Sequence, residues 1–455
     1  FMIPACQNPS ISISGKCLSR SKQKELNMFD YVASGLSHTR ITLTRSNSNP
    51  KIQSIIKELT ASIQNKHNHT FSVLYNAYSE NKFPFIFDKM FDSNVKRYSD
   101  SGGLQVITLG KQFTPELKEK VYTNQAKNSN FAMSFDEIPI ESSLNSTITS
   151  KNDKIFNHEN FVKFAKKSGQ NLKEQIDLFL SLGKERRATI LPVVQGNSID
   201  GCKEWMYWLF HDLSEEERSI ISGMSFSMAA FGIGMKEESE RIMLLEQIED
   251  PLLHCHLLGF GSIQRFIPLL ILKYNGFLKK ISKISYDSTS QTANITLGRY
   301  LDRTGNIVKM NKFKSPMLTY VVEDVLKNLA EVFPDFLEKY ELKLNEHILY
   351  GTACQPKLFT KYSDCPIEMQ AVYVYLLTIS QVLNIMRVVN DSLTSKSALQ
   401  GLIERFGQKS SDTLISLLNN VHSVSDYFEW EKHAGTLLVS KKILTKPKDE
   451  VELIF

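Results

Sequence analysis

The sequence predicts an α/β fold: a (β/α)8 TIM barrel with insertions, followed by a mainly helical C-terminal region. Strand-like apolar runs alternate with helical periodicity up to about residue 300, several of these runs end in a polar residue, and strand signals fade after Tyr300. Alternating strands and helices form βα units around a parallel sheet. Roughly eight such units in about 250 residues fit a closed barrel better than an open sheet.

The composition is that of a globular chain with a large core. The chain has 455 residues, of which 42% are hydrophobic, enough for one large domain and an appendage. The net charge of +5 and the pI of about 8.6 permit a nucleic-acid partner without requiring one. The six cysteines are scattered, which favours a reducing compartment. Since neither a signal peptide nor a membrane-spanning apolar run is evident, we expect a cytoplasmic protein that does not enter a membrane.

The N-terminal part begins with a polar segment. Residues 1–35 are rich in Ser, Asn and Lys, so we expect an N-terminal arm, followed by a barrel domain over residues 36–300. The first expected elements are a strand over His38–Thr44, a helix over Ile52–Gln64 and a strand over Thr70–Tyr75. Further strand-like runs end at Asp100 or cover residues 131–136, 188–195, 223–230, 256–259 and 281–287, with helices over residues 160–182, 202–213, 236–249 and 262–274.

The remaining part, residues 301–455, reads as mainly helical. Helical periodicity covers residues 318–344, 367–392, 395–407 and 411–421, and a last strand signal covers Gly435–Val439. We expect these helices to pack against the barrel.

Four polar residues stand where such a barrel carries its active site. Asp100, Asp136, Gln195 and Asp287 each close an apolar, strand-like run. The carboxyl ends of barrel strands form the active-site face, so these side chains are expected to converge. Polar residues also end strands for purely structural reasons, but the set of four favours a site.

Several motifs together resemble the tRNA-guanine transglycosylases. Ser99–Gln105 is similar to their D-S-G-G-[FY]-Q-V signature, and Ser134–Glu137 (S-F-D-E) to their A-F-D-E. Val193–Gly196 (V-V-Q-G) resembles their base-reading strand, and His254–Gly261 resembles H-Y-L-M-G-V-G. Tyr286–Ser288 looks like the F-D-[CS] that holds the nucleophile. The order and spacing agree over roughly residues 70–300.

The resemblance implies a role for each matching residue. Asp287 would be the nucleophile that attacks the sugar carbon of a guanine nucleotide, and Asp100 the general acid and base. Asp136 and Gln195 would read the edge of the base. The other residues implied in substrate binding are Asn76, Ser101, Gly102, Leu104, Ala229, Ala230, Leu258 and Gly259, with Leu104 and Leu258 sandwiching the base.

The chemistry of the residue types agrees with these roles. Breaking a glycosidic bond with retention needs one carboxylate at the anomeric carbon and a second group that transfers protons to the leaving atoms. A guanine edge offers N–H donors and a carbonyl acceptor, so a carboxylate and an amide such as Asp136 and Gln195 complement it. Water exclusion by an apolar clamp would strengthen these hydrogen bonds.

Two departures separate the chain from the tRNA enzymes. Their zinc site needs C-x-C-x-x-C and a later His, whereas the corresponding region has only Cys354 and Cys365, and Ser380 stands in place of the His. A rebuilt site from His347, Cys354 and Cys365 is the alternative to no metal. The P-T-R segment after the nucleophile is also absent, as Thr289–Ala293 shows. We therefore expect no cofactor or metal, and a closer likeness to the branch that inserts 7-deazaguanine bases into DNA in bacteria and phages.

A DNA substrate would present its guanine flipped out of the helix or in a single strand. We expect phosphate contacts near the barrel mouth from two basic groups. One consists of Lys279, Lys280 and Lys283, and the other of Arg186 and Arg187. The second substrate is a free 7-deazaguanine base. Met235 stands where many queuine-pathway enzymes have a Glu, which favours an uncharged substituent such as cyano. A homodimer is compatible with the sequence, and a phage-encoded enzyme would act in the host cytoplasm.

Two other functions stay open. The first is a tRNA-guanine transglycosylase that has lost its zinc site, and the second is a non-catalytic partner subunit of such an enzyme. A non-catalytic subunit is expected to lose its catalytic aspartates and keep its structural module. This chain instead keeps Asp100 and Asp287, which favours an enzyme.

Overall fold

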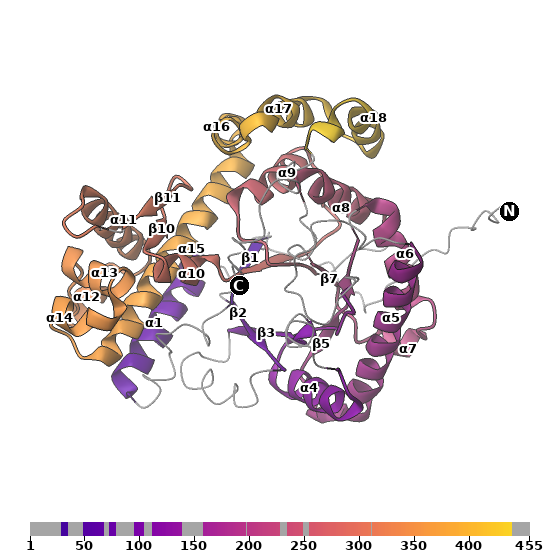
Figure 1. Ribbon diagram of the computed structural model, residues 1–455, viewed down its shortest axis with the longest axis horizontal. Coiled ribbons are helices and arrows are strands. Elements are labelled where there is room, and N and C mark those ends of the chain that lie inside the picture. The colour runs from indigo at the N-terminus through magenta and orange to yellow at the C-terminus, as the bar shows by residue number, and fades with distance from the viewer. Residues whose placement is uncertain are drawn as a thin grey trace.

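A single parallel sheet forms the centre of the molecule. The computed structural model describes residues 29–34, 49–67, 72–78, 95–103, 112–138, 158–196, 198–227, 234–248, 254–310 and 312–438. Within them, nine parallel strands form one sheet in the order β5-β4-β3-β2-β1-β9-β8-β7-β6, and helices surround it (Figure 1). The strands are β1 (Phe29–Ala33), β2 (Ser72–Asn76), β3 (Lys96–Asp100), β4 (Phe131–Met133), β5 (Thr189–Leu191), β6 (Val193–Val194), β7 (Met224–Ser227), β8 (Cys255–Leu258) and β9 (Ile284–Ser288). The predicted α/β barrel class is confirmed.

The sheet returns to its starting strand through a proline. β5 and β6 stand at opposite ends of the strand order, yet only Pro192 separates them along the chain. Proline has no N–H for a ladder and interrupts the strand. Ile190 of β5 also bridges Ile221, and the Ser225 amide donates to the Pro192 carbonyl at 2.9 Å. β5 and β6 therefore act as one interrupted strand next to β4 on one side and β7 on the other, which brings the sheet close to the eight-stranded closure of a TIM barrel.

The first strand lies in the segment that was expected to be an arm. β1 pairs with β9 through all five of its residues, from Phe29 opposite Ile284 to Ala33 opposite Ser288, and it also pairs with β2. All five residues are buried. The arm predicted over residues 1–35 therefore overlaps the barrel at residues 29–33. The expected strand His38–Thr44 lies outside the described residues.

Helices cover the outside of the sheet, as the ring around the barrel in Figure 1 shows. They are α1 (Pro50–His67), α4 (Pro115–Asn128), α5 (His158–Ser181), α6 (Ile199–Phe210), α7 (Glu215–Arg218), α8 (Met235–Gln247), α9 (Ile263–Tyr274) and α10 (Ser290–Thr296). The sequence analysis missed α4, in which polar residues outnumber the buried Val121, Tyr122 and Ala126. Ser198 begins α6 by accepting a hydrogen bond from the Gly201 amide at 3.1 Å.

The C-terminal region is helical, as predicted, and joins the barrel through one long helix. After the hairpin β10 (Arg299–Leu301) and β11 (Ile307–Lys309) come α11 (Pro316–Val332), α12 (Phe336–Lys339), α13 (Glu346–Ala353), α14 (Phe359–Ser363), α15 (Gln370–Thr394), α16 (Lys396–Phe406), α17 (Ser411–Asn420) and α18 (Val424–Ala434). α15 packs on α1, α9 and α10. The apolar segment 367–394 is long enough to cross a membrane, but 89% of its most apolar stretch is buried inside the molecule, as in a core helix. The predicted strand at Gly435–Val439 was wrong, because residues 435–438 form a 3-10 turn.

Candidate active site

Polar side chains gather where the parallel strands end. Asn76 and Asp100 are the last residues of β2 and β3 and lie opposite each other in register. The Asn76 amide donates to Asp100 Oδ2 at 3.3 Å. Asp287 lies near the same end of β9, Gln195 directly follows β6, and Asp136 lies three residues beyond β4. Because all these strands run in one direction, the five side chains share the carboxyl end of the barrel.

Asp287 is held by contacts from strand β8 and the loop that follows it. Its side chain is buried, and Oδ1 accepts a hydrogen bond from the Gly259 amide at 2.8 Å. Nε2 of His256 lies 3.5 Å from the same oxygen. The Phe260 amide donates to the Asp287 backbone carbonyl at 2.8 Å, which ties the loop after β8 to β9. Gly259 has a φ of +69°, a conformation that glycine adopts without strain.

Asp100 lies in a different environment. Burial raises the pKa of its carboxyl to about 6, and the negative charge of Asp287 adds to the rise, while the amides of Gly102 and Ser101 oppose it. Gly102 has a φ of +85°, and a Cβ there would lie 2.4 Å from Cβ of Tyr78. The glycine therefore allows the turn that brings two amides to the Asp100 carboxyl. A pKa near 6 lets one group donate a proton and later accept one near neutral pH.

Asp136 and Gln195 form a second polar pair. The Gln195 amide nitrogen donates to Asp136 Oδ2, and burial raises the pKa of Asp136 to about 7 despite this hydrogen bond. Gln195 is fully buried, and its Oε1 has no hydrogen-bond partner among the described residues. A Cβ on Gly103 would lie 3.2 Å from the Asp136 carbonyl, so the loop after β3 packs closely here. A carboxyl and a free amide oxygen side by side can accept from and donate to a planar heterocycle.

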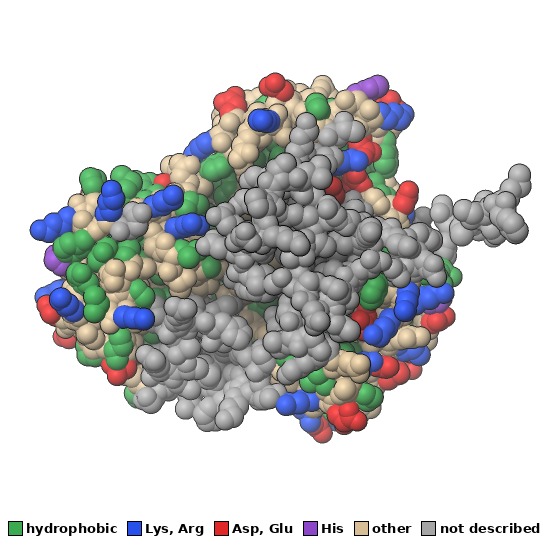
Figure 2. Space-filling view, viewed as in Figure 1, with side chains coloured by type: hydrophobic (Ala, Val, Ile, Leu, Met, Phe, Trp, Pro, Cys, Tyr) green, Lys and Arg blue, Asp and Glu red, His purple; other side chains and the backbone are tan. Residues whose placement is uncertain are grey.

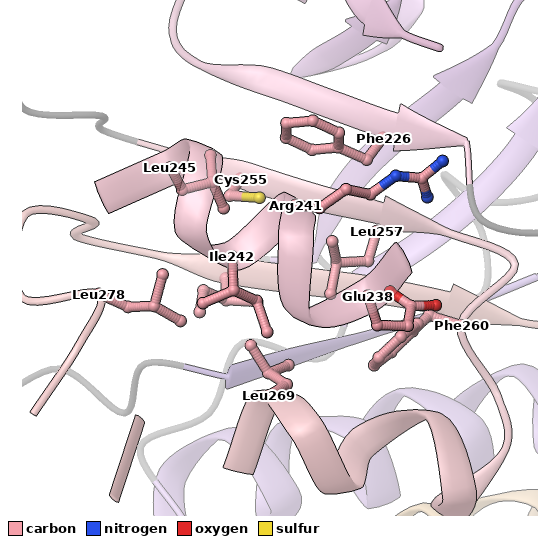
Figure 3. Close-up of a pocket in the computed structure, with 11 residues that line it drawn as sticks. Phe226, Glu238, Arg241, Ile242, Leu245, Cys255, Leu257, Phe260, Leu269 and Leu278 are labelled. Atoms are coloured by element: carbon pink, nitrogen blue, oxygen red, sulfur yellow. The ribbon is translucent and has the colours of Figure 1, made fainter. Parts of the chain in front are cut away.

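Helices α8 and α9 support the strand ends from outside. Arg241 of α8 donates to the Ser227 carbonyl at 2.9 Å and to the Gly196 carbonyl, and Arg265 of α9 donates to the Gly259 carbonyl at 3.4 Å. In Figure 3 the Arg241 guanidinium extends towards the end of the strand that carries Phe226. Burial raises the pKa of the neighbouring Glu238 to about 8. The sequence analysis missed these residues, because nothing marks a helical arginine as facing a strand end.

The Glu238 carboxyl borders a small cavity behind the strand ends. The cavity measures about 20 Å³, roughly the space of one water molecule. Its other walls are mostly apolar and include Leu245, Leu257 and Leu269 (Figure 3). It is too small for a base or a sugar.

The other predicted substrate-binding residues divide into two groups. Ser101 is buried at the end of β3, where its hydroxyl donates to the Ser134 carbonyl at 3.4 Å. Leu258 is half-buried at the end of β8 and packs against the cluster that fills the barrel. Leu104, Ala229 and Ala230 lie outside the described residues.

The predicted phosphate-binding residues do not lie at the barrel mouth. Lys279, Lys280 and Lys283 precede β9, and Arg186 and Arg187 precede β5, so both groups lie at the amino end of the barrel, opposite Asp287. This part of the prediction was wrong. Lys279, Lys280 and Lys283 are close to Asp287 in the sequence, but the length of strand β9 separates them from it in space. Lys283 instead forms an ion pair of 2.5 Å with the buried Asp30. On the face in Figure 2, Lys and Arg side chains mix with Asp and Glu around the described rim of the barrel.

The residues weighed for a rebuilt metal site each have another contact. The Cys354 thiol lies 2.6 Å from the Met310 carbonyl, the Cys365 thiol lies 3.3 Å from the Ser363 carbonyl, and the His347 ring packs edge-on against Phe313. Within the part of the chain that the structure describes, no three His, Cys, Asp or Glu side chains are grouped to hold a metal ion.

Comparisons with known proteins add no family assignment. No protein-family model matches the chain, and no curated protein matches it. The case for a function therefore rests on the site and on the motifs.

Proposed function

We propose that this protein is a pentosyltransferase that exchanges guanine in DNA for a 7-deazaguanine base of the 7-cyano type. The observation that carries the proposal is the contrast between two aspartates at one end of the barrel. Asp287 accepts a hydrogen bond from the Gly259 amide and lies beside His256. Burial and the charge of Asp287 raise the pKa of Asp100 to about 6. A carboxyl with a raised pKa beside a second carboxyl fits the usual division between an acid–base group and a nucleophile. The motif resemblance supports the same assignment.

The reaction would proceed by double displacement. An oxygen of Asp287 attacks C1′ of the nucleotide, the bond from C1′ to the base nitrogen breaks, and Asp100 gives its proton to the departing guanine. The product is a glycosyl ester on Asp287. Asp100, now ionised, takes a proton from the incoming deazaguanine, whose nitrogen attacks C1′ and releases the Asp287 carboxylate. No cofactor takes part, and the nucleotide must leave the base stack to reach the site.

The base would bind at Asp136 and Gln195. In the structure these two side chains bond to each other. A base that inserts between them would exchange this hydrogen bond for contacts to its own edge, and it would also satisfy Gln195 Oε1. Met235, the first residue of α8, offers no charge to a cationic substituent. The proposal therefore favours a neutral 7-substituent over an aminomethyl group.

The test is transfer of radiolabelled guanine and labelled 7-cyano-7-deazaguanine into DNA and, separately, into tRNA. We expect label in DNA, its loss in Asp287→Ala, and retention in Asp177→Ala, which changes an exposed aspartate of α5. Denaturing gels should show a covalent protein–DNA adduct that also needs Asp287. Label only in tRNA would replace DNA by tRNA as the substrate. No label in either, from folded protein, would refute the exchange reaction.

A further inference from the structure

A chain of buried polar side chains runs through the barrel interior towards Asp287. Ser285 of β9 lies between two histidines, with Oγ at 2.6 Å from His254 Nε2 and 2.7 Å from His256 Nδ1. Tyr98 stacks on His256, and its hydroxyl lies 3.3 Å from His254 Nε2. Lys283 Nζ lies 5.8 Å from the centre of the Tyr98 ring, and Lys283 pairs with Asp30. None of these groups has a role in the double displacement described above.

The single proton of Ser285 limits how this chain can be arranged. A hydroxyl donates one hydrogen bond, so Ser285 cannot donate to both histidines. His254 Nδ1 has no hydrogen-bond partner among the described residues. A buried N–H without an acceptor is rare and costly, so the single proton of neutral His254 belongs on Nε2. His254 then donates to Ser285, and Ser285 donates to His256.

A second contact leads to the same arrangement. His256 Nε2 is buried, has no hydrogen-bond partner within normal distance among the described residues, and lies 3.5 Å from Asp287 Oδ1. A lone pair on Nε2 would face a carboxylate oxygen and repel it, whereas an N–H there attracts it. If Nε2 carries the proton, Nδ1 is the acceptor that Ser285 needs. Both ends of the chain therefore give one proton pattern, in which His254 donates to Ser285, Ser285 donates to His256, and His256 faces Asp287.

We propose that His256 is a positioning residue for Asp287, fixed by Ser285 and His254 as the neutral tautomer with its proton on Nε2. The His256 N–H and the Gly259 amide then both point at Oδ1 of Asp287, which leaves Oδ2 as the oxygen that attacks. The last step, the attack, rests on the proposed function, but the tautomer does not. Burial, together with the charge of Lys283, lowers the pKa of His254 well below its usual value, which keeps that ring neutral. The charged or titratable groups that face His256 are Asp287, Tyr98 and His254, with the Lys283–Asp30 pair behind Tyr98.

The direct test reads the tautomer in the protein without substrate. Full-length protein with ¹⁵N-labelled histidine is examined by two-bond ¹H–¹⁵N correlation at pH 7, and spectra of His254→Gln and His256→Gln assign the two rings. We expect His256 and His254 neutral with the proton on Nε2, and we expect Ser285→Ala to turn His256 into a mixture of tautomers. A proton on Nδ1 of His256, or a doubly protonated ring, would overturn the proposal.

A second test uses two substitutions of similar size. Glutamine can place an N–H near the position of Nε2, whereas leucine cannot. If Asp287 forms a covalent intermediate, His256→Leu should slow its formation about 100-fold with KM for DNA unchanged. His256→Gln should restore most of the rate. Equal loss in both variants, with equal melting temperatures, would reduce His256 to a packing residue. If wild-type protein transfers no base, the proposed function fails, and the tautomer spectrum still decides the role of His256.

Discussion

At the scale of single residues, the site differs from an ordinary polar strand edge in the raised pKa values of its carboxyls. The pKa of Asp100 rises to about 6 and that of Asp136 to about 7, both chiefly through burial. The two groups also repel each other, which adds to the rise for Asp136. Carboxyls whose pKa lies close to neutral pH cost stability when they are ionised, and in a barrel mouth they indicate a functional site. Each predicts its own pH dependence.

The Asp100 pKa predicts how the first half-reaction responds to pH. A group that protonates the leaving base must carry a proton, so the rate of covalent intermediate formation should be constant below about pH 6 and fall about tenfold per pH unit above it. Asp100→Asn cannot donate a proton and should lower the rate about 100- to 10,000-fold. Rapid-quench trapping of the adduct across pH 5 to 9 measures both. An alkaline limb that persists in Asp100→Asn would assign the acid to another group.

The Asp136 pKa predicts a change in stability with pH. Its folded pKa of about 7 lies above the ordinary value of about 4, so the folded state binds the proton more tightly than the unfolded state. Its contribution to the free energy of unfolding is therefore greatest below pH 4 and is lost as the pH rises through 7. Asp136→Asn resembles the protonated form and should be more stable than wild type by about 2 kcal/mol at pH 8, with a smaller gain at pH 5.

Urea denaturation at the two pH values measures this difference. Asp177→Asn, on the exposed face of α5, is the matched control and should show no such pH dependence. An equal gain for Asp136→Asn at pH 5 and pH 8 would mean that the effect has a cause other than the ionisation of Asp136.

At the scale of elements, helix α5 and helix α6 show how closely the outer layer packs. A Cβ on Gly169 of α5 would lie 2.2 Å from the Trp208 carbonyl of α6. Gly169→Ala must push the helices apart and should destabilise the protein by about 1 to 3 kcal/mol. Gly401 of α16 has nothing within 4 Å of such a Cβ, so Gly401→Ala should instead stabilise it by roughly 0.5 to 1 kcal/mol. Thermal melting of both variants tests the pair, and a loss in both would contradict the packing argument.

The same scale shows what sequence patterns can predict. The alternation of strand-like runs and helical periodicity predicted β2 to β9 and the main helices, because most strand residues are buried and each long helix has an apolar side. The ends of β3, β6 and β9 then placed Asp100, Gln195 and Asp287 at one edge. The strand β1 was missed because F-D-Y-V-A carries a buried charge, and its ion-pair partner Lys283 lies far away in the sequence. The basic groups were misplaced for a related reason, since sequence distance does not reveal which end of a strand a residue occupies.

The polar chain around His256 was also outside the reach of sequence. His254, His256 and Ser285 alternate with apolar neighbours as any half-buried strand does. Only the register of β8 against β9, which sets His256 opposite Ser285, shows that they meet. The contact between His256 and Ser285 thus follows from the pairing of β8 with β9 and not from the sequence motif alone.

At the scale of the whole molecule, a polar network fixes the helix α15, which packs against the barrel. Asn384 of α15 donates to the Leu301 carbonyl at 3.0 Å and to Asp324 Oδ2 at 2.8 Å. Ser380 of α15 bonds Tyr300 at 2.6 Å and Asn328 at 2.7 Å. All five side chains that form these bonds are buried. The contacts tie β10, α11 and α15 together, and α15 in turn packs on α9 and α10 of the barrel.

This connection predicts that the two parts unfold together. The three tryptophans are suited to the test, because Trp205 and Trp208 lie in the barrel helix α6 and Trp430 lies in α18. Fluorescence of Trp430→Phe then reports on the barrel, and that of the double variant Trp205→Phe/Trp208→Phe on the helical region. Both should give one urea midpoint. Asn384→Ala removes one buried donor to the Asp324 carboxyl and a buried donor to the Leu301 carbonyl, so it should lower both midpoints equally, by about 1 to 3 kcal/mol in free energy of unfolding. Separate midpoints, or a shift seen only from Trp430, would mean that the network stabilises the helical region alone and that the barrel folds without it.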